Sequence, residues 1–278
     1  MSTNGQEKIY SIVTDRIIAE LEKGTVPWRR PWDESVSLPT NLKSMKAYRG
    51  SNILMLMTAG FSSKYWLTYK QAHELGGKIK TGEKGTPVTF WSFISKDESE
   101  NSLKHAFLKY YTVFNLAQCE GLKAPEELTK TDIVPLAAAE EIVRNYPSPP
   151  TILSGRNASY HQETDIVTVP HLSDYIVESA IEEYYSTLFH ELVHSTGHTS
   201  RLNRDLTARR GSDCYSFEEL IAELGSAFLC AMAGISNEVI ENQASYIANW
   251  LAALKNDNKL LIRAGSKAQA AVDRITNY

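Results

Sequence analysis

Residues 187–198 read TLFHELVHSTGH, and this stretch places His190 and His194 four positions apart with Glu191 between them. On an α-helix, side chains at positions i and i+4 project from the same face, so both imidazoles can bind one metal ion. Glu191 is rotated from His190 by about 100° and can reach a water molecule at that ion. The H-E-x-x-H spacing therefore predicts the metal site of a zinc hydrolase on a helix.

The residues around the motif support this helix. The segment ESAIEEYYSTLF, residues 178–189, contains no Gly or Pro, and Gly197 follows the second histidine where a helix would end. Apolar residues recur at spacings of three and four through this region, namely Tyr185, Leu188, Phe189, Leu192 and Val193. One face is thus expected to pack in a core while another carries the histidines. The alternative is a buried helix whose histidines only bond to backbone carbonyls.

A catalytic zinc ion normally takes three protein ligands and leaves a fourth position open, so a third ligand must lie elsewhere in the chain. His198 is a poor candidate, because the metzincin pattern would put the third histidine where this chain has Ser200. A better source is SFEELIAELGSAFLCAMAG, residues 216–234, which is predicted to form an amphipathic helix. Ser216 is its expected N-cap, and Glu219 completes a capping box.

This helix offers Glu219 and Glu223 one turn apart, and the pair resembles the E-x-x-x-D pattern of thermolysin-like gluzincins. In those enzymes the first carboxylate binds zinc and the second orients a ligand histidine. The pattern favours Glu219 as the third ligand and Glu223 as the residue that supports a histidine. If the Glu219 side chain is used in the capping box, it is not available to the metal, and Glu223 is the ligand instead. Glu218 is expected to be solvated.

A ligand set of two imidazoles and one carboxylate suits Zn²⁺, although Mn²⁺ or Co²⁺ can occupy the same ligands. The expected chemistry is metal-assisted hydrolysis, in which Glu191 takes a proton from water and passes it to the leaving amine. Tyr160 and Tyr215 are candidates for a hydroxyl that stabilises the oxyanion. Residues 158–170, ASYHQETDIVTVP, read as two short strands about a turn, where zincins pair with an extended peptide.

Composition narrows the class of protein. The 278 residues, 42% of them hydrophobic, are enough for two domains with ordinary cores. No apolar run approaches bilayer-spanning length, and the first residues lack the features of a signal peptide. Cys119, Cys214 and Cys230 lie far apart, which disfavours both a disulfide framework and a cysteine zinc site. We therefore expect a cytoplasmic protein with no membrane partner.

Charge is distributed unevenly along the chain. Residues 1–115 contain 16 Lys and Arg against 11 Asp and Glu, a balance of +5, whereas the remaining 163 residues carry −9. Between residues 40 and 90, aromatic residues are interleaved with the cations. Cations bind a phosphate backbone and exposed aromatic faces stack on unpaired bases, so this mixture suits single-stranded nucleic acid. The alternative is that these aromatic residues lie in the core. A net charge of −9 over the last 163 residues is too small to favour a second domain that mimics DNA.

Periodicity and turn residues give a coarse outline of the fold. Helices are expected over residues 6–23, 136–146, 242–256 and 266–278, a helix or buried segment over 51–60, a further element over 63–77, and strands over 82–95 and 103–116. Prolines between residues 125 and 150 indicate a boundary. The sequence thus predicts an α+β protein of two domains. Residues 1–122 form an α+β nucleic-acid-binding domain, 123–150 connect, and 151–278 form a mainly helical domain with a small β-sheet.

Several motifs occur together, and in the same order, in a known family. They are PWRRPW at 27–32, YRGSN at 48–52, WLTYKQAHELGGKIKTGEKG at 66–85, FNLAQCEG at 114–121 and HELVHSTGHTSRLNRD at 190–205. Over nearly its whole length the chain resembles ArdC-type antirestriction proteins of conjugative plasmids and related mobile elements. The resemblance implies an N-terminal domain that binds single-stranded DNA, joined to a zincin-like, gluzincin-type metallopeptidase domain. It also implies protection of incoming single-stranded plasmid DNA from the recipient's restriction endonucleases.

The resemblance carries over to individual residues. It implies that His190, His194 and a Glu of the EELIAE segment are metal ligands and that Glu191 is the base. The DNA-binding motif matches at Trp28, Trp32, Tyr48, Arg49, Asn52, Trp66, Tyr69, Lys78, Lys80 and Lys84. Two hypotheses remain open. The protein is either an endopeptidase that cleaves a protein such as a restriction enzyme, or a non-catalytic protein that coats single-stranded DNA and keeps a structural or vestigial metal site.

Overall fold

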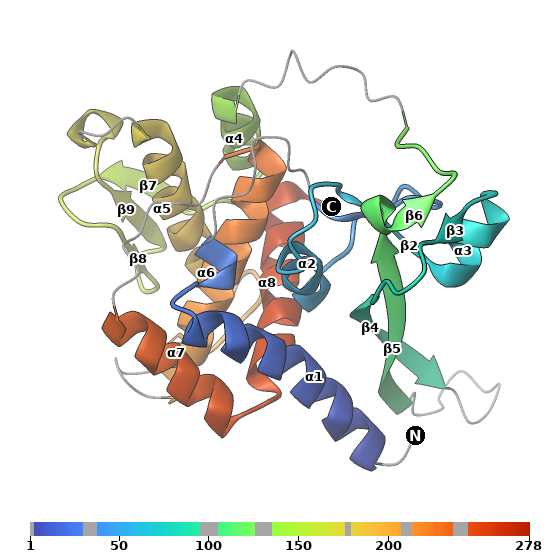
Figure 1. Ribbon diagram of the computed structural model, residues 1–278. Coiled ribbons are helices and arrows are strands. Elements are labelled where there is room, and N and C mark those ends of the chain that lie inside the picture. Colours follow the sequence, from blue (N-terminus) through green and yellow to red (C-terminus); the bar gives the residue numbers. More distant parts are fainter. Residues whose placement is uncertain are drawn as a thin grey trace.

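The computed structural model describes residues 3–29, 38–94, 105–125, 135–175, 179–206, 213–235 and 244–278. Within these ranges the chain has an N-terminal part built around a sheet and a C-terminal part that is mainly helical (Figure 1). The predicted α+β architecture, with a small sheet beside the C-terminal helices, is confirmed. None of the helices in the described ranges combines the length and the apolar character that a membrane span requires.

The N-terminal sheet has the strand order β1-β2-β5-β4. Its strands are β1 (Thr40–Asn41), β2 (Tyr65–Thr68), β4 (Thr86–Ile94) and β5 (His105–Asn115). β1 and β2 run parallel, and the other neighbours run antiparallel. This part also contains α2 (Ser51–Met57), α3 (Tyr69–Glu74) and the short ladder of β3 (Lys78–Ile79) with β6 (Cys119–Glu120). β4 and β5 are the strands predicted over residues 82–95 and 103–116, and they form a long hairpin.

The segment expected to be one element over residues 63–77 is divided between a strand and a helix. The aromatic and branched residues before Thr68 pair with β5. The Thr68 hydroxyl then accepts a hydrogen bond from Gln71 N–H and begins α3 with a capping box. Trp66 therefore lies in a strand and Tyr69 at the start of a helix.

The C-terminal part is organised around one apolar helix. Its elements are α4 (Pro135–Arg144), β7 (Thr151–Ser154), β8 (Ser159–His161), β9 (Ile166–Val169), α5 (Ala180–Ser195), α6 (Asp213–Ala233), α7 (Ala244–Asn256) and α8 (Leu260–Thr276), with the sheet order β7-β9-β8. Helix α6 is buried along most of its length and contacts both α5 and α8. Gly225 lets α6 approach α5 closely, since an added Cβ would lie 2.7 Å from Val193 Cγ2. This contact joins the two helices that carry the predicted metal ligands.

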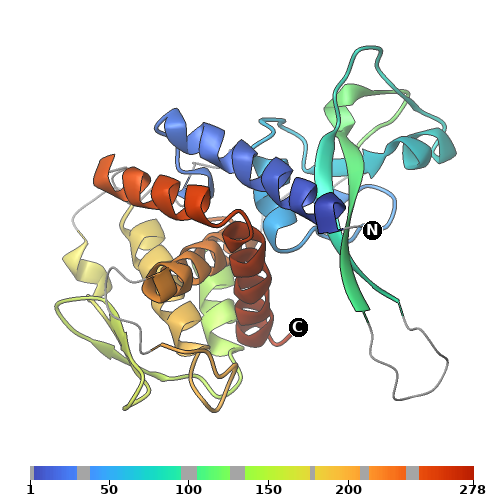
Figure 2. The same ribbon diagram turned by 90° about the horizontal axis from the view of Figure 1, so that it is seen from below.

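Helix α1 (Thr3–Glu22) packs with the C-terminal helices and lies along α7 (Figure 2). Its apolar side chains Ile9, Val13, Ile17 and Leu21 are buried in the same core as α6 and α8. The Thr14 hydroxyl donates to Asn258 O at 2.7 Å, across 244 positions of sequence. Trp28 meets Trp250 of α7 edge-on, with 5.9 Å between the ring centroids. The first and last segments of the chain therefore share one core.

Candidate metal centre

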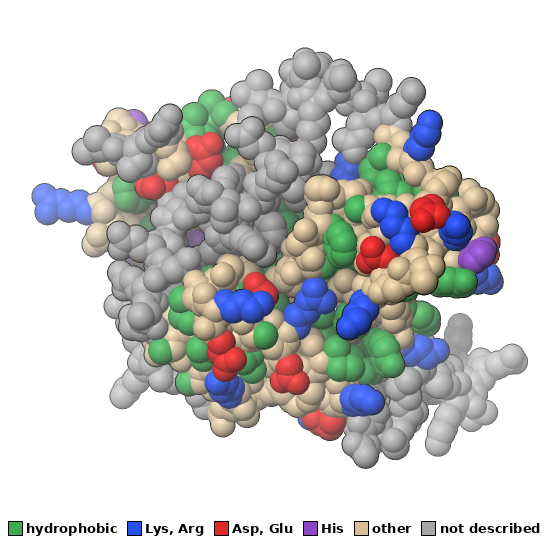
Figure 3. Space-filling model, in the orientation of Figure 1, with side chains coloured by type: hydrophobic (Ala, Val, Ile, Leu, Met, Phe, Trp, Pro, Cys, Tyr) green, Lys and Arg blue, Asp and Glu red, His purple; other side chains and the backbone are tan. Residues whose placement is uncertain are grey.

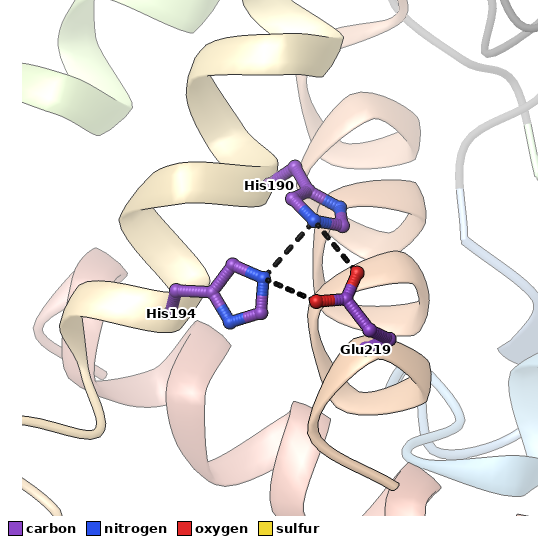
Figure 4. Close-up of side chains that lie close together, drawn as sticks. All are labelled: His190, His194 and Glu219. Carbon is purple, nitrogen blue, oxygen red and sulfur yellow. Dashed lines mark hydrogen bonds and ion pairs between the residues drawn. The ribbon is translucent and has the colours of Figure 1, made fainter. Parts of the chain in front are cut away.

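His190 and His194 project from one face of α5 toward Glu219 of α6 (Figure 4). The Nε2 atoms of the two histidines lie 3.1 Å apart. Glu219 Oε2 lies 3.6 Å from His190 Nε2, and Glu219 Oε1 lies 3.6 Å from His194 Nε2. One ligand atom from each residue lies within 4.8 Å of the other two. The helical repeat of α5 and its contact with α6 thus bring together the three residues predicted to bind metal.

The spacing of these atoms suits a small divalent cation. Ligand atoms that stand about 2.0–2.2 Å from a zinc ion at tetrahedral angles are roughly 3.3–3.6 Å from one another. The 3.1 Å between the two Nε2 atoms and the 3.6 Å from each Nε2 to a Glu219 oxygen, a different oxygen for each histidine, lie close to that range. Two imidazole nitrogens and a carboxylate are also donors that zinc accepts readily. The residues present therefore fit a metal ion.

A second carboxylate fixes the orientation of His194. Glu218 is buried, and its Oε1 lies 3.3 Å from His194 Nδ1. Arg204 donates to both oxygens of this carboxylate, at 2.7 and 2.9 Å, and also to Thr196 Oγ1 and Val193 O near the end of α5. Because an ionised Glu218 can only accept, the proton of a neutral His194 ring lies on Nδ1, and the Nε2 lone pair points into the site.

Two details of the predicted second helix are wrong. Glu218 was expected in solvent, but Arg204 and His194 surround it. Ser216 was expected as the N-cap, but α6 begins at Asp213, so Ser216 lies within the helix and Glu219 faces the histidines. Glu223, expected to support a ligand histidine, is buried one turn beyond Glu219 on the same helix.

Carboxylates shape the electrostatics of the site. Burial lowers the pKa of His190, but the hydrogen bond to Glu219 and the charges of Glu223 and Glu191 outweigh it and raise that pKa to about 9. Burial is the main cause that raises the pKa of Glu191, and the two histidines act in the opposite direction. Burial also opposes ionisation of Glu218, yet its hydrogen bonds to His194 and Arg204 hold its pKa below the usual value. A raised pKa suits Glu191 to accept a proton near neutral pH.

The site opens into a cleft of about 520 Å³ lined by residues of α5, α6 and β8. Glu191 lies in its wall beside His190 and His194. The backbone N–H of Tyr160 in β8 donates a hydrogen bond to the Glu191 carboxylate. β8 lies at the edge of its sheet, where it pairs with β9 along one edge only among the described strands. The two strands predicted over residues 158–170 are confirmed as β8 and β9. A sheet edge of this kind can pair with an extended chain.

The hydroxyl of Tyr160 has a structural partner. It donates to Asp165 Oδ1 at 2.9 Å, and Arg201 donates to both oxygens of the same carboxylate. Arg201 also donates to Ser195 O at 2.8 Å, so these contacts tie the β8–β9 hairpin to the end of α5. This geometry uses the Tyr160 hydroxyl for bracing and does not favour it as an oxyanion donor. The side chain of Tyr215 lies outside the described residues.

Some residues matched to the DNA-binding motif are buried. Trp28 and Trp66 are fully enclosed, which contradicts their predicted contact with DNA, since a buried ring offers no face to a base. Asn52 hydrogen-bonds to the backbone of Thr89 in β4. Its Nδ2 donates to Thr89 O at 2.7 Å, and its Oδ1 accepts from Thr89 N–H at 2.7 Å. This buried amide therefore holds α2 against the strand. Tyr48 is buried as well.

The other matched residues are exposed. They are Arg49, Tyr69, Lys78, Lys80 and Lys84, and Trp32 lies outside the described residues. Lys78 pairs with Glu120 at 3.0 Å, and Lys80 Nζ donates to Ala117 O at 2.7 Å. In the described part of the face in Figure 3, Lys and Arg side chains are interspersed with Asp and Glu. On that face the cations do not form an unbroken basic patch.

Arg204 of the metal centre was not predicted from the sequence, and neither was the exposure of Phe90. Arg204 lies within the quoted motif HELVHSTGHTSRLNRD, but its role depends on a loop that folds back along α5 to reach Glu218. Phe90 belongs to the aromatics interleaved with cations, yet a strand pattern does not reveal that its ring is 44% exposed beside a cleft. In the sequence, the position of Arg204 within this family motif was the signal that could have identified it.

Comparisons with known proteins assign both parts of the chain. Residues 7–114 match the N-terminal domain of anti-restriction factor ArdC, and residues 137–267 match a zincin-like metallopeptidase family. Two crystal structures of the antirestriction ArdC protein from the R388 plasmid, metal-free and Mn(II)-bound, are 36% and 37% identical to this chain. Both alignments cover 96% of this chain. They cover 96% of the metal-free structure and 97% of the Mn(II)-bound structure, with a TM-score of 0.77 in each case.

Two further relatives match most of this chain at lower coverage of their own length. The uncharacterized protein y4eC of Sinorhizobium fredii is 36% identical, over 95% of this chain and 90% of its own length. A DNA primase TraC of Escherichia coli is 32% identical over 98% of this chain, but the match spans only 20% of the primase. The likeness to TraC is therefore confined to a segment of a much longer protein.

Proposed function

Because this chain belongs to the ArdC family of antirestriction proteins, we propose that it binds single-stranded DNA, carries a metal-dependent peptidase site and protects incoming mobile-element DNA from restriction. The observation that carries the peptidase part is the convergence of His190, His194 and Glu219 in a cleft that also holds Glu191. We place this action in the cytoplasm, where incoming DNA and restriction endonucleases meet.

The zincin-like domain implies a divalent metal, and a relative has been crystallised with Mn(II). We propose Zn²⁺ for this chain, held by His190, His194 and Glu219, because its donor set and spacing suit that ion. When bound, the ion would polarise a peptide carbonyl and make a water molecule more acidic. Mn²⁺ and Co²⁺ are accepted by the same donors.

Each remaining residue of the site has a role that follows from its contacts. Glu191, whose pKa is raised by burial, would accept the proton of the attacking water and return it to the leaving amine. Glu218 and Arg204 hold His194 in the orientation that ligation needs. The edge of β8 would align an extended peptide along the cleft. The substrate we propose is a protein such as a restriction enzyme.

The assignment of the third ligand can be tested by metal analysis. Glu219→Gln removes an anionic ligand, so the purified variant should contain far less Zn²⁺ than the wild type when both are equilibrated with the same free metal. Glu223→Gln is the matched control, because it makes the same substitution one turn away on α6. We expect it to retain near-stoichiometric metal. Loss of metal from Glu223→Gln alone would assign ligation to that residue.

Single-stranded DNA binding is tested by its salt dependence. We expect the logarithm of affinity for an oligonucleotide to fall linearly with the logarithm of salt concentration, because bound cations displace counterions. Replacing Lys78 and Lys80 together with alanine should flatten the slope by up to about 1.4, at roughly 0.7 for each phosphate contact. Fluorescence anisotropy measures both. Arg144→Ala with Lys255→Ala, which removes two exposed cations of the C-terminal part, should leave the slope unchanged.

A further inference from the structure

A second large cleft lies away from the metal centre, between the N-terminal part and α8. Its volume is about 660 Å³, within the range of ligand sites. One wall comes from residues 41–52 and β4, and the other from one face of α8, at least 172 positions later in the sequence. Helices α2 and α8 lie side by side at this place (Figure 1). The cleft therefore exists only when both parts of the chain are assembled.

The floor of the cleft is fixed by hydrogen bonds among uncharged polar groups. Asn41 Nδ2 donates to Tyr48 Oη at 3.2 Å and to Gln71 Oε1 at 3.1 Å. Gln71 is held in turn by the capping box that begins α3. From the opposite wall, Gln269 Oε1 accepts from Gly50 N–H at 2.9 Å. Amides and a phenol of this kind hydrogen-bond the edges of nucleobases as well as each other.

One exposed aromatic residue lines the mouth of the cleft, and a second contacts it from the neighbouring strand. Phe90 of β4 lines it and is 44% exposed. Tyr111 of β5, which is 47% exposed, lies on the same face of the hairpin and meets Phe90 edge-on, with 5.6 Å between the ring centroids. Exposed ring faces of this kind can take unpaired bases, whereas the bases of a duplex are already stacked.

Cations lie at the same mouth. Lys46 and Arg49 both line the cleft, and Arg49 is ion-paired with Asp273 of α8. The Arg49 guanidinium also lies over the ring of Tyr278, 5.3 Å from its centroid. Both members of the ion pair are partly exposed, and an exposed pair contributes little, so a phosphate group can replace Asp273 as the partner of Arg49.

We propose that this composite cleft binds nucleotides of a single strand, with a base stacked on Phe90 and Tyr111 and a phosphate held by Arg49 and Lys46. Helix α8 of the metallopeptidase part supplies one wall, and Asp273 competes with the phosphate. This inference rests on the proposed DNA binding and locates it at a site that the N-terminal part cannot form alone. The buried Trp28 and Trp66 have no part in stacking.

The test measures binding of a fluorescein-labelled oligothymidylate to the full chain by anisotropy at fixed salt. Phe90→Ala and Tyr111→Ala should each weaken binding by roughly 5- to 150-fold, since each removes a stacking ring. Tyr110→Ala is the matched control. This tyrosine neighbours Tyr111 with the same 47% exposure but points to the opposite face of β5, so binding should be unchanged. Phe90→Leu, which keeps an apolar side chain, separates loss of stacking from loss of folding.

Removing the charge of Asp273 should strengthen DNA binding, whereas removing a stacking ring should weaken it. Asp273→Asn should tighten binding by about 1.5- to 5-fold, because Arg49 is released from an exposed ion pair. Asp257→Asn makes the same change in net charge at the Arg263 pair, which does not line the cleft, and should have no such effect. If wild-type protein binds but the Phe90, Tyr111 and Asp273 variants bind equally well, the composite site is refuted while DNA binding stands. If wild-type protein fails to bind at low salt, both proposals are refuted.

Discussion

Replacing Glu191 with glutamine should lower the rate of peptide hydrolysis by roughly 10²- to 10⁴-fold, the contribution expected of a positioned general base. The amide keeps the size of the side chain and can still accept the hydrogen bond from the Tyr160 backbone N–H. It cannot take up a proton from water. Metal content and DNA affinity should stay at the wild-type level, because Glu191 is neither among the clustered ligand atoms nor part of the α8 cleft.

The measurement uses a fluorogenic peptide library with protein loaded with Zn²⁺, followed by restriction assays in a recipient strain. Glu182→Gln, a carboxylate on the same helix that does not line the cleft, is the control and should retain full activity. Hydrolysis at the wild-type rate in Glu191→Gln would exclude Glu191 as the base. Lost hydrolysis with intact antirestriction would favour a protein that protects DNA by coating the strand.

Removing the Arg204 side chain should lower the free energy of unfolding by roughly 3–5 kcal/mol, the cost of leaving one member of a buried ion pair without its partner. Arg204 and Glu218 are both buried, and Arg204 also donates to Val193 O and Thr196 Oγ1 at the end of α5. Arg204→Leu therefore uncovers both a carboxylate and a helix end. Denaturant unfolding monitored by circular dichroism measures the change, and metal affinity should fall by about 10- to 100-fold because His194 loses its brace.

The exposed pair of Arg263 with Asp257 provides the control, and Arg263→Leu should change stability by no more than about 1 kcal/mol. Arg204→Leu combined with Glu218→Leu should recover part of the loss, because no unpaired charge remains. The folded-state pKa of Glu218 is held below its unfolded value, so its stabilisation is present above the unfolded pKa and is lost as the pH falls through the folded one. Glu218→Gln should flatten the acid side of the stability profile. An unchanged profile would contradict this account.

Local rules predicted the parts of this protein that depend on neighbouring positions in sequence. The four-residue spacing of His190 and His194 requires only a helix, and the alternation in β4 and β5 requires only a sheet. Glu219 was reached through its spacing to Glu223, which is also local. The start of α6 was misplaced because Ser216 and Glu219 fit a capping box that the longer helix does not use.

Properties set by distant contacts were beyond local rules. Glu218 was expected in solvent because nothing near it in sequence indicates that Arg204 folds back to meet it. Trp28 and Trp66 are aromatic residues of the kind that stack on bases, but contacts with residues distant in sequence bury both rings. Trp250 packs on Trp28, and the core of the N-terminal sheet packs on Trp66. The cleft beside α8 depends on the docking of two parts that no single motif spans.

The packing of α1 against α7 has a consequence for synthesis of the chain. The Thr14 hydroxyl meets its acceptor on Asn258 only after 244 further residues have been made, which takes about 12–50 s at ribosomal rates of roughly 5–20 residues per second. During that interval the apolar stripe of Ile9, Val13 and Ile17 lacks the partner helix that finally covers it. Until then this stripe stays partly exposed, so deleting α1 or the C-terminal helices should leave apolar core surface in solvent and promote aggregation.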